Sequence, residues 1–323
     1  MSSYIHKGKY ISSPFQEKLD LLDIILDFSY NTISSNMLIF VFEMKTIRLC
    51  IFIVFINFIT IGLNAQIMAN QSSIYNIDSL RQNFDKTPSF GLYKDNYFIF
   101  GIPTSHAPTV KNSNAKFQLS ISQRLTKSVL PWDTYLYLFY TQKCFWNIID
   151  DSMPMTDINF NPGIGLTKPL FVKDRFIGKI SLILEHESNG KDSINSRSWE
   201  RISLAANIVV DPNFIVHGKF WVPIVDGKHN KDLLNYAGIF QVGASFSSIN
   251  QKFGVAFNLT KREGWNLNYN TTIEFSYRFS RKSTQHLFLQ FYNGYGEGLF
   301  NYKQHSSMIR AGIVIKPNLF SEY

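Results

Sequence analysis

The chain has 323 residues, of which 45% are hydrophobic and 15% aromatic. This length and composition fit one or two soluble domains or one membrane barrel, and the abundant Phe and Tyr favour strands over helices. Cys50 and Cys144 are the only cysteines, which excludes a disulfide framework. The net charge of +8 lies wholly in Gln66–Tyr323, because the first 65 residues hold five basic and five acidic side chains. On a membrane barrel this positive charge suits anionic lipid headgroups. Nucleic acid is the other partner that such a charge permits, but no clustered basic helix supports it.

The first recognisable element is a secretory signal. Residues 44–48 form a basic start, 49–63 an apolar run, and 64–66 include a small residue before a cleavage point. The run is shorter than the roughly 20 residues of a transmembrane helix, and no basic residue directly follows it. We therefore predict a signal peptide at 44–65, after which the mature chain begins. Residues 1–43 precede this signal, and we interpret them as a non-native extension from a misplaced translation start.

The mature chain starts with an aperiodic stretch at 66–94, which we interpret as a periplasmic lead-in, and then breaks into short segments of alternating character. Alternation with period two is typical of a strand with one apolar face. Each segment is about as long as the 9–11 residues that a tilted transmembrane strand needs. The segments lie near 95–103, 116–126, 134–146, 161–172, 175–188, 198–211, 214–225, 236–248, 251–262, 267–280, 285–296 and 305–316.

Twelve is an even number of strands, as single-chain bacterial barrels require. The chain also ends in aromatic residues, Phe320 and Tyr323, which is usual in outer-membrane barrels. We therefore predict an all-β fold, a twelve-stranded antiparallel transmembrane β-barrel over residues 95–323. A soluble β-sandwich is the alternative.

Two neighbouring segments carry reactive side chains on their apolar rows. His186 and Ser188 continue the apolar row of 180–184, and Glu200 shares a row with the apolar residues of 202–208. Polar groups that face lipid are costly, so three of them on these rows indicate a function. A serine becomes a nucleophile when an imidazole takes its proton and an acceptor holds the other ring nitrogen. The alternative is a strand end with an ordinary Ser-Asn-Gly turn.

These residues resemble the bacterial outer-membrane phospholipases A. The family's His-x-Ser-Asn-Gly motif matches 186–190, and its Ser-Arg-Ser-Trp-Asn-Arg motif matches 196–201 at the same spacing. Two further stretches agree, Tyr140–Lys143 and Tyr292–Leu299, and the resemblance runs from about Leu92 to Phe320. It implies a carboxylic ester hydrolase, phospholipase A1 or A2, in the bacterial outer membrane. It also implies Ca²⁺ as cofactor, membrane phospholipids as substrates and an active homodimer.

The resemblance assigns catalytic roles to single residues. Ser188 is expected to be the nucleophile, His186 the general base, and the backbone N–H of Gly190 part of the oxyanion hole. The family usually has Asn where this chain has Glu200. A carboxylate orients the histidine and also stabilises the imidazolium, and serine hydrolases elsewhere use Asp or Glu in this role.

The calcium ligands and the dimer contact also follow from the resemblance. Hard cations prefer oxygen ligands. Ser196 matches a ligand hydroxyl, and the carbonyl of Lys191 matches a position that is usually arginine. Ser152 resembles a serine donated by the other subunit, and Asp192 is a further candidate oxygen donor. Gln142 matches a glutamine at the dimer interface; a polar residue that faces the lumen is the alternative.

Two other patterns carry no function. The glycine-rich stretch Gly294–Gly298 lacks the lysine and the helix of a phosphate-binding loop, so we interpret it as the end of a hairpin. The remaining histidines lack metal-ligand spacing: His217, His229, His286 and His305.

The sequence thus favours a calcium-dependent outer-membrane phospholipase A with a Ser-His-Glu triad on the lipid-facing side of the barrel. One alternative is a lipid A deacylase, because some such barrels also combine His-x-Ser-Asn with a glutamate. The other is a non-enzymatic porin or structural barrel in which Glu200 marks a decayed site.

Overall fold

The computed structural model describes residues 84–172, 175–225, 229–280, 283–317 and 322–323. The predicted signal peptide, the extension before it and most of the lead-in lie outside the described residues. The strands are β1 (Phe90–Leu92), β2 (Asn96–Pro103), β3 (Asn114–Arg124), β4 (Tyr135–Trp146), β5 (Met155–Val172), β6 (Arg175–Ser188), β7 (Ser198–Asp211), β8 (Phe214–Val225), β9 (Phe240–Ser247), β10 (Phe253–Lys261), β11 (Tyr269–Arg278), β12 (Gln285–Gly294) and β13 (Ser306–Ile315). The short helices are η1 (Pro131–Asp133), η2 (Ser193–Asn195) and α3 (Leu234–Ala237).

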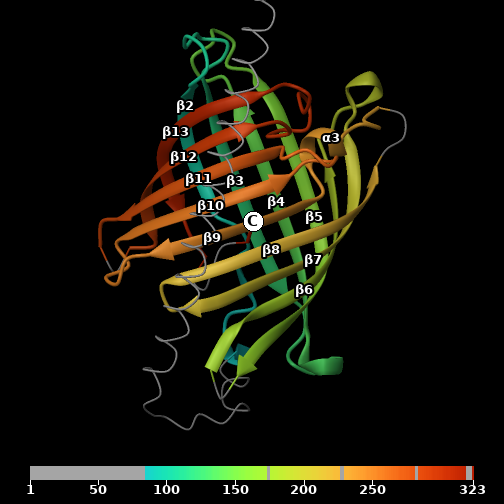
Figure 1. The fold of residues 1–323 in the computed structure, drawn as a ribbon, viewed down its shortest axis with the longest axis vertical. Coiled ribbons are helices and arrows are strands. Elements are labelled where there is room, and N and C mark those ends of the chain that lie inside the picture. The colour runs from blue at the N-terminus through green and yellow to red at the C-terminus, as the bar shows by residue number, and fades with distance from the viewer. Residues whose placement is uncertain (1–83, 173–174, 226–228, 281–282, 318–321) are drawn as a thin grey trace, which may run out of the picture. The chain divides into compact units, whose positions relative to one another are not determined.

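Strands β2 to β13 form one closed antiparallel ring (Figure 1). Each strand pairs with its neighbours along the chain, and β2 also pairs with β13, which closes the barrel. The predicted twelve-stranded barrel is therefore confirmed. Among the described residues, no helix is long and apolar enough to cross a membrane.

Most predicted strand ends lie within two residues of the observed ones, and three differences are larger. β9 begins at Phe240 rather than near 236, because the short helix α3 precedes it. β5 begins at Met155 rather than near 161: Asp157 and Asn159 are buried, and Ile158 and Phe160 lie on the other face, so the alternation already holds there and the start was missed. The third difference is β1, a three-residue strand that pairs with β3 and takes no part in the ring.

The two faces of the barrel have opposite polarity. On β6, Leu182 and Leu184 point outward and are 52% and 51% exposed, whereas Ser181, Ile183 and Glu185 are buried. Strands in a transmembrane barrel alternate in this way, because lipid covers the outside and polar groups fill the inside. Exposed apolar side chains continue this outer belt around the ring: Phe98, Leu138, Leu204, Val222, Phe257, Phe275 and Ile313.

Long and short connections separate the two ends of the barrel. The β6–β7, β8–β9 and β12–β13 connections all lie at one end, as consecutive antiparallel hairpins require, and they span residues 189–197, 226–239 and 295–305. At the opposite end, only residues 212–213 join β7 to β8. In bacterial barrels the longer connections face the outside of the cell and the short turns face the periplasm.

Segments from both ends of the barrel sequence fill the lumen. The ring of Tyr93 stacks on Phe139 with a centroid distance of 4.4 Å. The ring of Tyr323 stacks on His217 at 4.2 Å, and Figure 1 marks the C-terminus within the outline of the barrel. Tyr323 lies beyond the last strand, which ends at Ile315. This terminal aromatic is thus a lumen residue.

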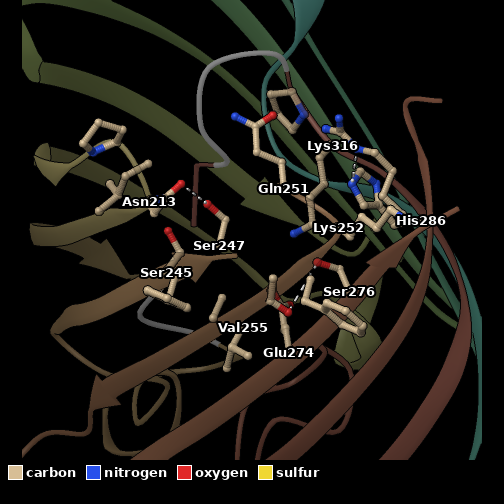
Figure 2. Close-up of a pocket in the computed structure, with 18 of the residues that line it drawn as sticks. Asn213, Ser245, Ser247, Gln251, Lys252, Val255, Glu274, Ser276, His286 and Lys316 are labelled. Carbon is tan, nitrogen blue, oxygen red and sulfur yellow. Dashed lines mark hydrogen bonds between the residues drawn. The ribbon is translucent and has the colours of Figure 1, made fainter. Parts of the chain in front are cut away.

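A cavity of about 270 Å³ remains at the short-turn end of the lumen. Figure 2 shows polar side chains around it, among them Ser245, Glu274, Ser276 and His286. None of the residues predicted for the active site lines this cavity.

Candidate active site

The predicted reactive groups meet on the β6–β7 hairpin. In the register of this pair, His186 lies opposite Glu200, and Ser188 lies opposite Ser198. The Nδ1 atom of His186 is 2.9 Å from the Oε1 atom of Glu200. Their side chains are 42% and 46% exposed and continue the lipid-facing rows, as the alternation predicts. The carboxylate is thus in position to accept a hydrogen bond from the ring.

Ser188 is the last residue of β6 and shares the outer row with His186. Two residues of strand correspond to roughly 6.6 Å of rise. Among the described residues, the Ser188 hydroxyl forms no hydrogen bond, so it is not bonded to the imidazole in this conformation. The structure thus joins His186 to Glu200 and places Ser188 beside them on the same face.

The connection after Ser188 is organised by Asn189, which is 3% exposed. Its side-chain oxygen accepts hydrogen bonds from the backbone N–H groups of Lys191, at 3.3 Å, and Arg197, at 3.0 Å. Its amide donates to the carbonyl of Asn195 at 2.9 Å. One buried amide therefore fixes the loop that carries Gly190, Lys191 and Ser196. Asn189 had no predicted role of its own, although Asn commonly organises turns in this way.

Gly190 has a backbone φ of +63°, in the left-handed region that favours glycine. A Cβ atom at this position would lie 2.7 Å from Cε2 of Phe160, the residue that pairs with Ser188 from β5. Both the conformation and the close ring require glycine here. The direction of the Gly190 backbone is therefore defined directly beside the predicted nucleophile.

The predicted calcium ligands are oxygen donors on two connections. Ser196 is half-buried and Asp192 is exposed, both in the 189–197 loop, whereas Ser152 is exposed in the β4–β5 connection. The Lys191 ammonium lies 3.6 Å from the centroid of the Phe300 ring; the oxygen that Lys191 can offer a cation is its backbone carbonyl. Among the described residues, no group of three His, Cys, Asp or Glu side chains is arranged to hold a metal. Hydroxyl and carbonyl oxygens are donors that a hard cation prefers.

Gln142 lies on the outer face of β4. Its Oε1 accepts from the Tyr140 hydroxyl at 2.9 Å, and its amide lies 3.4 Å from the Cys144 sulfur. The intervening residues Thr141 and Lys143 line the lumen. The lumen-facing alternative for Gln142 is therefore wrong, and a polar side chain occupies the lipid-facing row.

The residues that we expected to lack function take structural positions. His217 pairs with Asn258 in the lumen, and His286 accepts a hydrogen bond from Arg278 at 3.1 Å. Gly294 is the last residue of β12, and residues 295–298 begin the connection to β13, so the interpretation of Gly294–Gly298 as a hairpin end is confirmed.

The β8–β9 and β12–β13 connections are joined next to the predicted site by a set of contacts to Asp232, which we call the clasp. The Tyr302 hydroxyl donates to Asp232 at 2.5 Å, and the Lys303 ammonium is 2.7 Å from the same carboxylate. The hydrogen bonds from Lys303 and Tyr302 hold the pKa of Asp232 below its ordinary value. Burial, followed by the hydrogen bond to Asp232, raises the pKa of Tyr302 to about 12. The Arg197 guanidinium lies 6.0 Å from the Tyr302 ring, which connects this clasp to the active-site loop.

Comparison with known proteins identifies the family. The sequence model of the phospholipase A1 family matches residues 76–315. A phospholipase A1 of Salmonella typhimurium is 27% identical over 258 residues, which cover 74% of this chain and 86% of that protein. A phospholipase A1 of Proteus vulgaris is 24% identical over 254 residues, with the same shares covered.

Solved structures share the fold. The outer membrane phospholipase A of Escherichia coli superposes with a TM-score of 0.62 at 23% identity, over 71% of this chain and 98% of that one. The outer membrane phospholipase of Salmonella typhi, solved as a dimer with bound calcium, gives a TM-score of 0.62 at 23% identity, over 76% and 97%.

The family match spans most of the described chain, and the ring of twelve strands with its apolar outer belt is a barrel of the bacterial outer membrane. The predicted family, fold and location are therefore confirmed. The chain belongs to the phospholipase A1 family, the outer-membrane phospholipases A that hydrolyse the esters of phospholipids.

Proposed function

We propose that this protein hydrolyses the acyl esters of glycerophospholipids with Ser188 as nucleophile, His186 as general base and Glu200 as the acceptor that orients the histidine. One observation carries the proposal. His186 and Glu200 form a 2.9 Å contact on a face whose neighbouring side chains point into lipid. A paired histidine and carboxylate on such a face has no packing role and is costly unless it serves chemistry.

The proposed reaction begins when Nε2 of His186 takes the proton of the Ser188 hydroxyl as its oxygen attacks the ester carbonyl. Glu200 accepts a hydrogen bond from Nδ1, which keeps the other ring nitrogen unprotonated and stabilises the imidazolium that forms. The imidazolium then protonates the leaving alcohol, which leaves the acyl group on Ser188. Water, deprotonated by His186, attacks this acyl-enzyme and releases the fatty acid, and the proton returns to the Ser188 oxygen. The serine and the ring must approach each other, as catalytic groups commonly do when substrate binds.

Gly190 and the rest of its loop would stabilise the oxyanion. The backbone N–H of Gly190 would donate to the oxygen that becomes negative in the transition state. Calcium, when bound, supplies positive charge next to this oxygen. The Lys191 carbonyl and the Ser196 hydroxyl would hold the ion, together with Ser152 of the partner subunit in a homodimer. Gln142, polar on the lipid face, would contribute to the contact between the two copies.

The outward position of the site suits a membrane substrate, because an ester bond in the outer leaflet would reach Ser188 without leaving the bilayer. The porin alternative receives no support from the lumen, where Tyr93, Phe139 and a network of charged side chains occupy the interior.

The test measures fatty acid release from vesicles of phosphatidylethanolamine and phosphatidylglycerol, with and without calcium. The wild-type protein is expected to release fatty acid, and Ser188→Ala and His186→Ala are expected to lose nearly all activity while they remain folded, heat-modifiable barrels. Loss of one triad member typically removes most of the catalysis. Near-native release by Ser188→Ala would refute the proposed nucleophile. Release from lipid A alone would favour the deacylase instead.

A further inference from the structure

The lumen side of the β6–β7 hairpin carries charged residues that the proposed reaction does not use. Glu185 and Glu187 flank His186 in the sequence and point inward while His186 points outward. Arg201 lies opposite Glu185 in the register, one residue after Glu200. Its Nε is 3.2 Å from Glu185, and its Nη2 is 3.1 Å from Glu187. One guanidinium therefore joins the residues on both sides of the catalytic histidine to the neighbouring strand.

These charges are removed from solvent. The side chains of Arg201, Glu185 and Glu187 are 12%, 0% and 14% exposed. Two carboxylates at alternate positions of one strand share a face and repel one another. The planar fork of an arginine can bind two carboxylates at once, which the point charge of a lysine does less well. Loss of the guanidinium would leave buried charge without its compensation.

Further contacts hold both carboxylates in place. The Ser203 hydroxyl donates to Glu185 at 3.0 Å, and the Lys219 ammonium on β8 is 2.6 Å from the same carboxylate. The indole N–H of Trp199 donates to Glu187 at 3.1 Å, and the Arg201 guanidinium lies 4.1 Å from the Trp199 ring. Arg201 is thus the central member of a cluster that spans three strands directly behind His186 and Glu200.

We propose that Arg201 is a positioning residue for the catalytic pair; this inference rests on the proposed function. On the β7 side the ladder runs through His186 to Ser188. On the β5 side it is interrupted, because Glu185 and Ser188 have partners there and His186 between them has none, so the regular ladder restrains the histidine from the β7 side alone. The ion pairs to Glu185 and Glu187 supply the missing restraint from the lumen. They fix the backbone on both sides of His186 against β7 and thereby set the aim of the ring at Glu200 and Ser188.

The experiment compares kcat and KM for Arg201→Gln and Arg201→Lys on mixed micelles of phospholipid and detergent with calcium. A displacement of about 1 Å at reacting groups can cost roughly 10²-fold in rate, so Arg201→Gln is expected to lower kcat about 10²-fold with KM within about twofold. A lysine reaches one carboxylate and not both. Arg201→Lys is therefore expected to restore part of kcat, with a loss of about tenfold.

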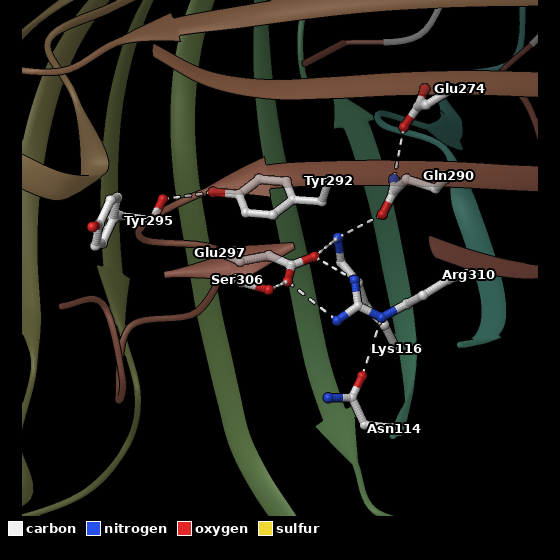
Figure 3. A network of polar contacts seen from close by, with 9 residues as sticks. All are labelled: Asn114, Lys116, Glu274, Gln290, Tyr292, Tyr295, Glu297, Ser306 and Arg310. Atoms are coloured by element: carbon white, nitrogen blue, oxygen red, sulfur yellow. Dashed lines mark hydrogen bonds and ion pairs between the residues drawn. The ribbon is translucent and has the colours of Figure 1, made fainter. Parts of the chain in front are cut away.

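Arg310 on β13 provides a matched control. Its guanidinium binds Glu297 in the lumen at 2.6 Å and 3.2 Å, and Lys116 is 3.0 Å from the same carboxylate (Figure 3). Arg310→Gln breaks a buried arginine–glutamate pair of the same type, on a strand that does not pair with β6 or β7. It is expected to lower barrel stability while kcat stays within about twofold of the wild type.

The possible results distinguish a failure of the positioning role of Arg201 from a failure of the proposed catalytic function. Unchanged kcat in both Arg201 variants, or equal kcat losses in Arg201→Gln and Arg310→Gln, would overturn the positioning role. Near-native activity of Ser188→Ala would instead refute the proposed function. If Arg201→Gln does not fold, the kcat and KM of the conservative Arg201→Lys variant decide, measured on its folded, heat-modifiable fraction.

Discussion

Replacement of Glu200 by glutamine, asparagine and alanine separates the charge of this side chain from its role as an acceptor for His186. Gln keeps the length and the acceptor oxygen and removes the charge. Asn also keeps an acceptor but is one methylene shorter, and it recreates the residue that the family usually has. Ala removes both contributions and leaves the ring without a protein acceptor.

The structure gives the expected magnitudes. The acceptor oxygen lies 2.9 Å from Nδ1 of the ring, and both side chains are near half exposed, so an effective dielectric constant of about 20 applies. Charge centres roughly 4 Å apart then interact with about 4 kcal/mol, which corresponds to about 10³-fold in rate for Glu200→Ala. A neutral acceptor loses this charge–charge interaction but keeps a hydrogen bond to the charged imidazolium, worth about 2.5 kcal/mol, so its net loss is about 1.5 kcal/mol. We therefore expect losses of about tenfold for Glu200→Gln and Glu200→Asn.

The assay measures kcat on mixed micelles with calcium, for variants that retain heat-modifiable migration in electrophoresis. Because Gln and Asn differ in reach, a loss confined to Asn would assign the effect to length rather than charge. If the Ala and Asn variants both turn over like the wild type, Glu200 is not the third member of the triad and the argument from its contact with His186 fails.

Four further predictions concern the loops and the leader. We expect activity to require calcium and the dimer together, so Ser152→Ala and Ser196→Ala should each raise the calcium concentration needed for half-maximal rate; full activity with EDTA or in a verified monomer contradicts this. Gly190→Ala keeps the backbone N–H but cannot hold its position, because of the φ of +63° and the close Phe160 ring; it should lower kcat by up to about 10²-fold, the cost of a lost oxyanion donor, and an unchanged kcat contradicts that role. Because the pKa of Asp232 is lowered, its contacts with Tyr302 and Lys303 are fully formed above the ordinary aspartate pKa of about 3.9 and are lost as pH falls through the lowered pKa. Hydrogen exchange of residues 229–239 should therefore accelerate in that acidic range in the wild type, and should show no such acceleration in Asp232→Asn. Mass spectrometry of the outer-membrane protein should find an N-terminus near Gln66, and retained residues 1–43 would refute the signal assignment.

The sequence predicted the barrel well because lipid and lumen impose opposite polarities on alternate residues of a strand. The limits of β6, β7 and β8 agree with the predicted segments to the residue. The same reasoning located His186, Ser188 and Glu200 on the outer face, since each interrupts an apolar row. It was least successful at the start of β5, where Asp157 and Asn159 alternate with Ile158 and Phe160.

Contacts across the lumen could not be predicted from the sequence. Alternation shows that Glu185 and Arg201 point inward, but it does not show which charges meet inside a closed ring. The position of Tyr323 was missed for the same reason, because its stacking partner His217 lies far away in the sequence. Asn189 was overlooked because a turn-forming asparagine and an organiser of a functional loop have the same local pattern.

The proposed catalytic groups lie within one hairpin, and this has a consequence for assembly. The contact between His186 and Glu200 spans 14 residues of chain, whereas Thr104 and Ser307, which meet where the first and last strands join, are 203 residues apart. The entropic cost of closing a loop grows with its length, and contacts between distant residues form late. We therefore expect the hairpin to pair early and the β2–β13 seam to close last. Defects at that seam should delay insertion into the membrane while the turnover of each completed barrel stays the same.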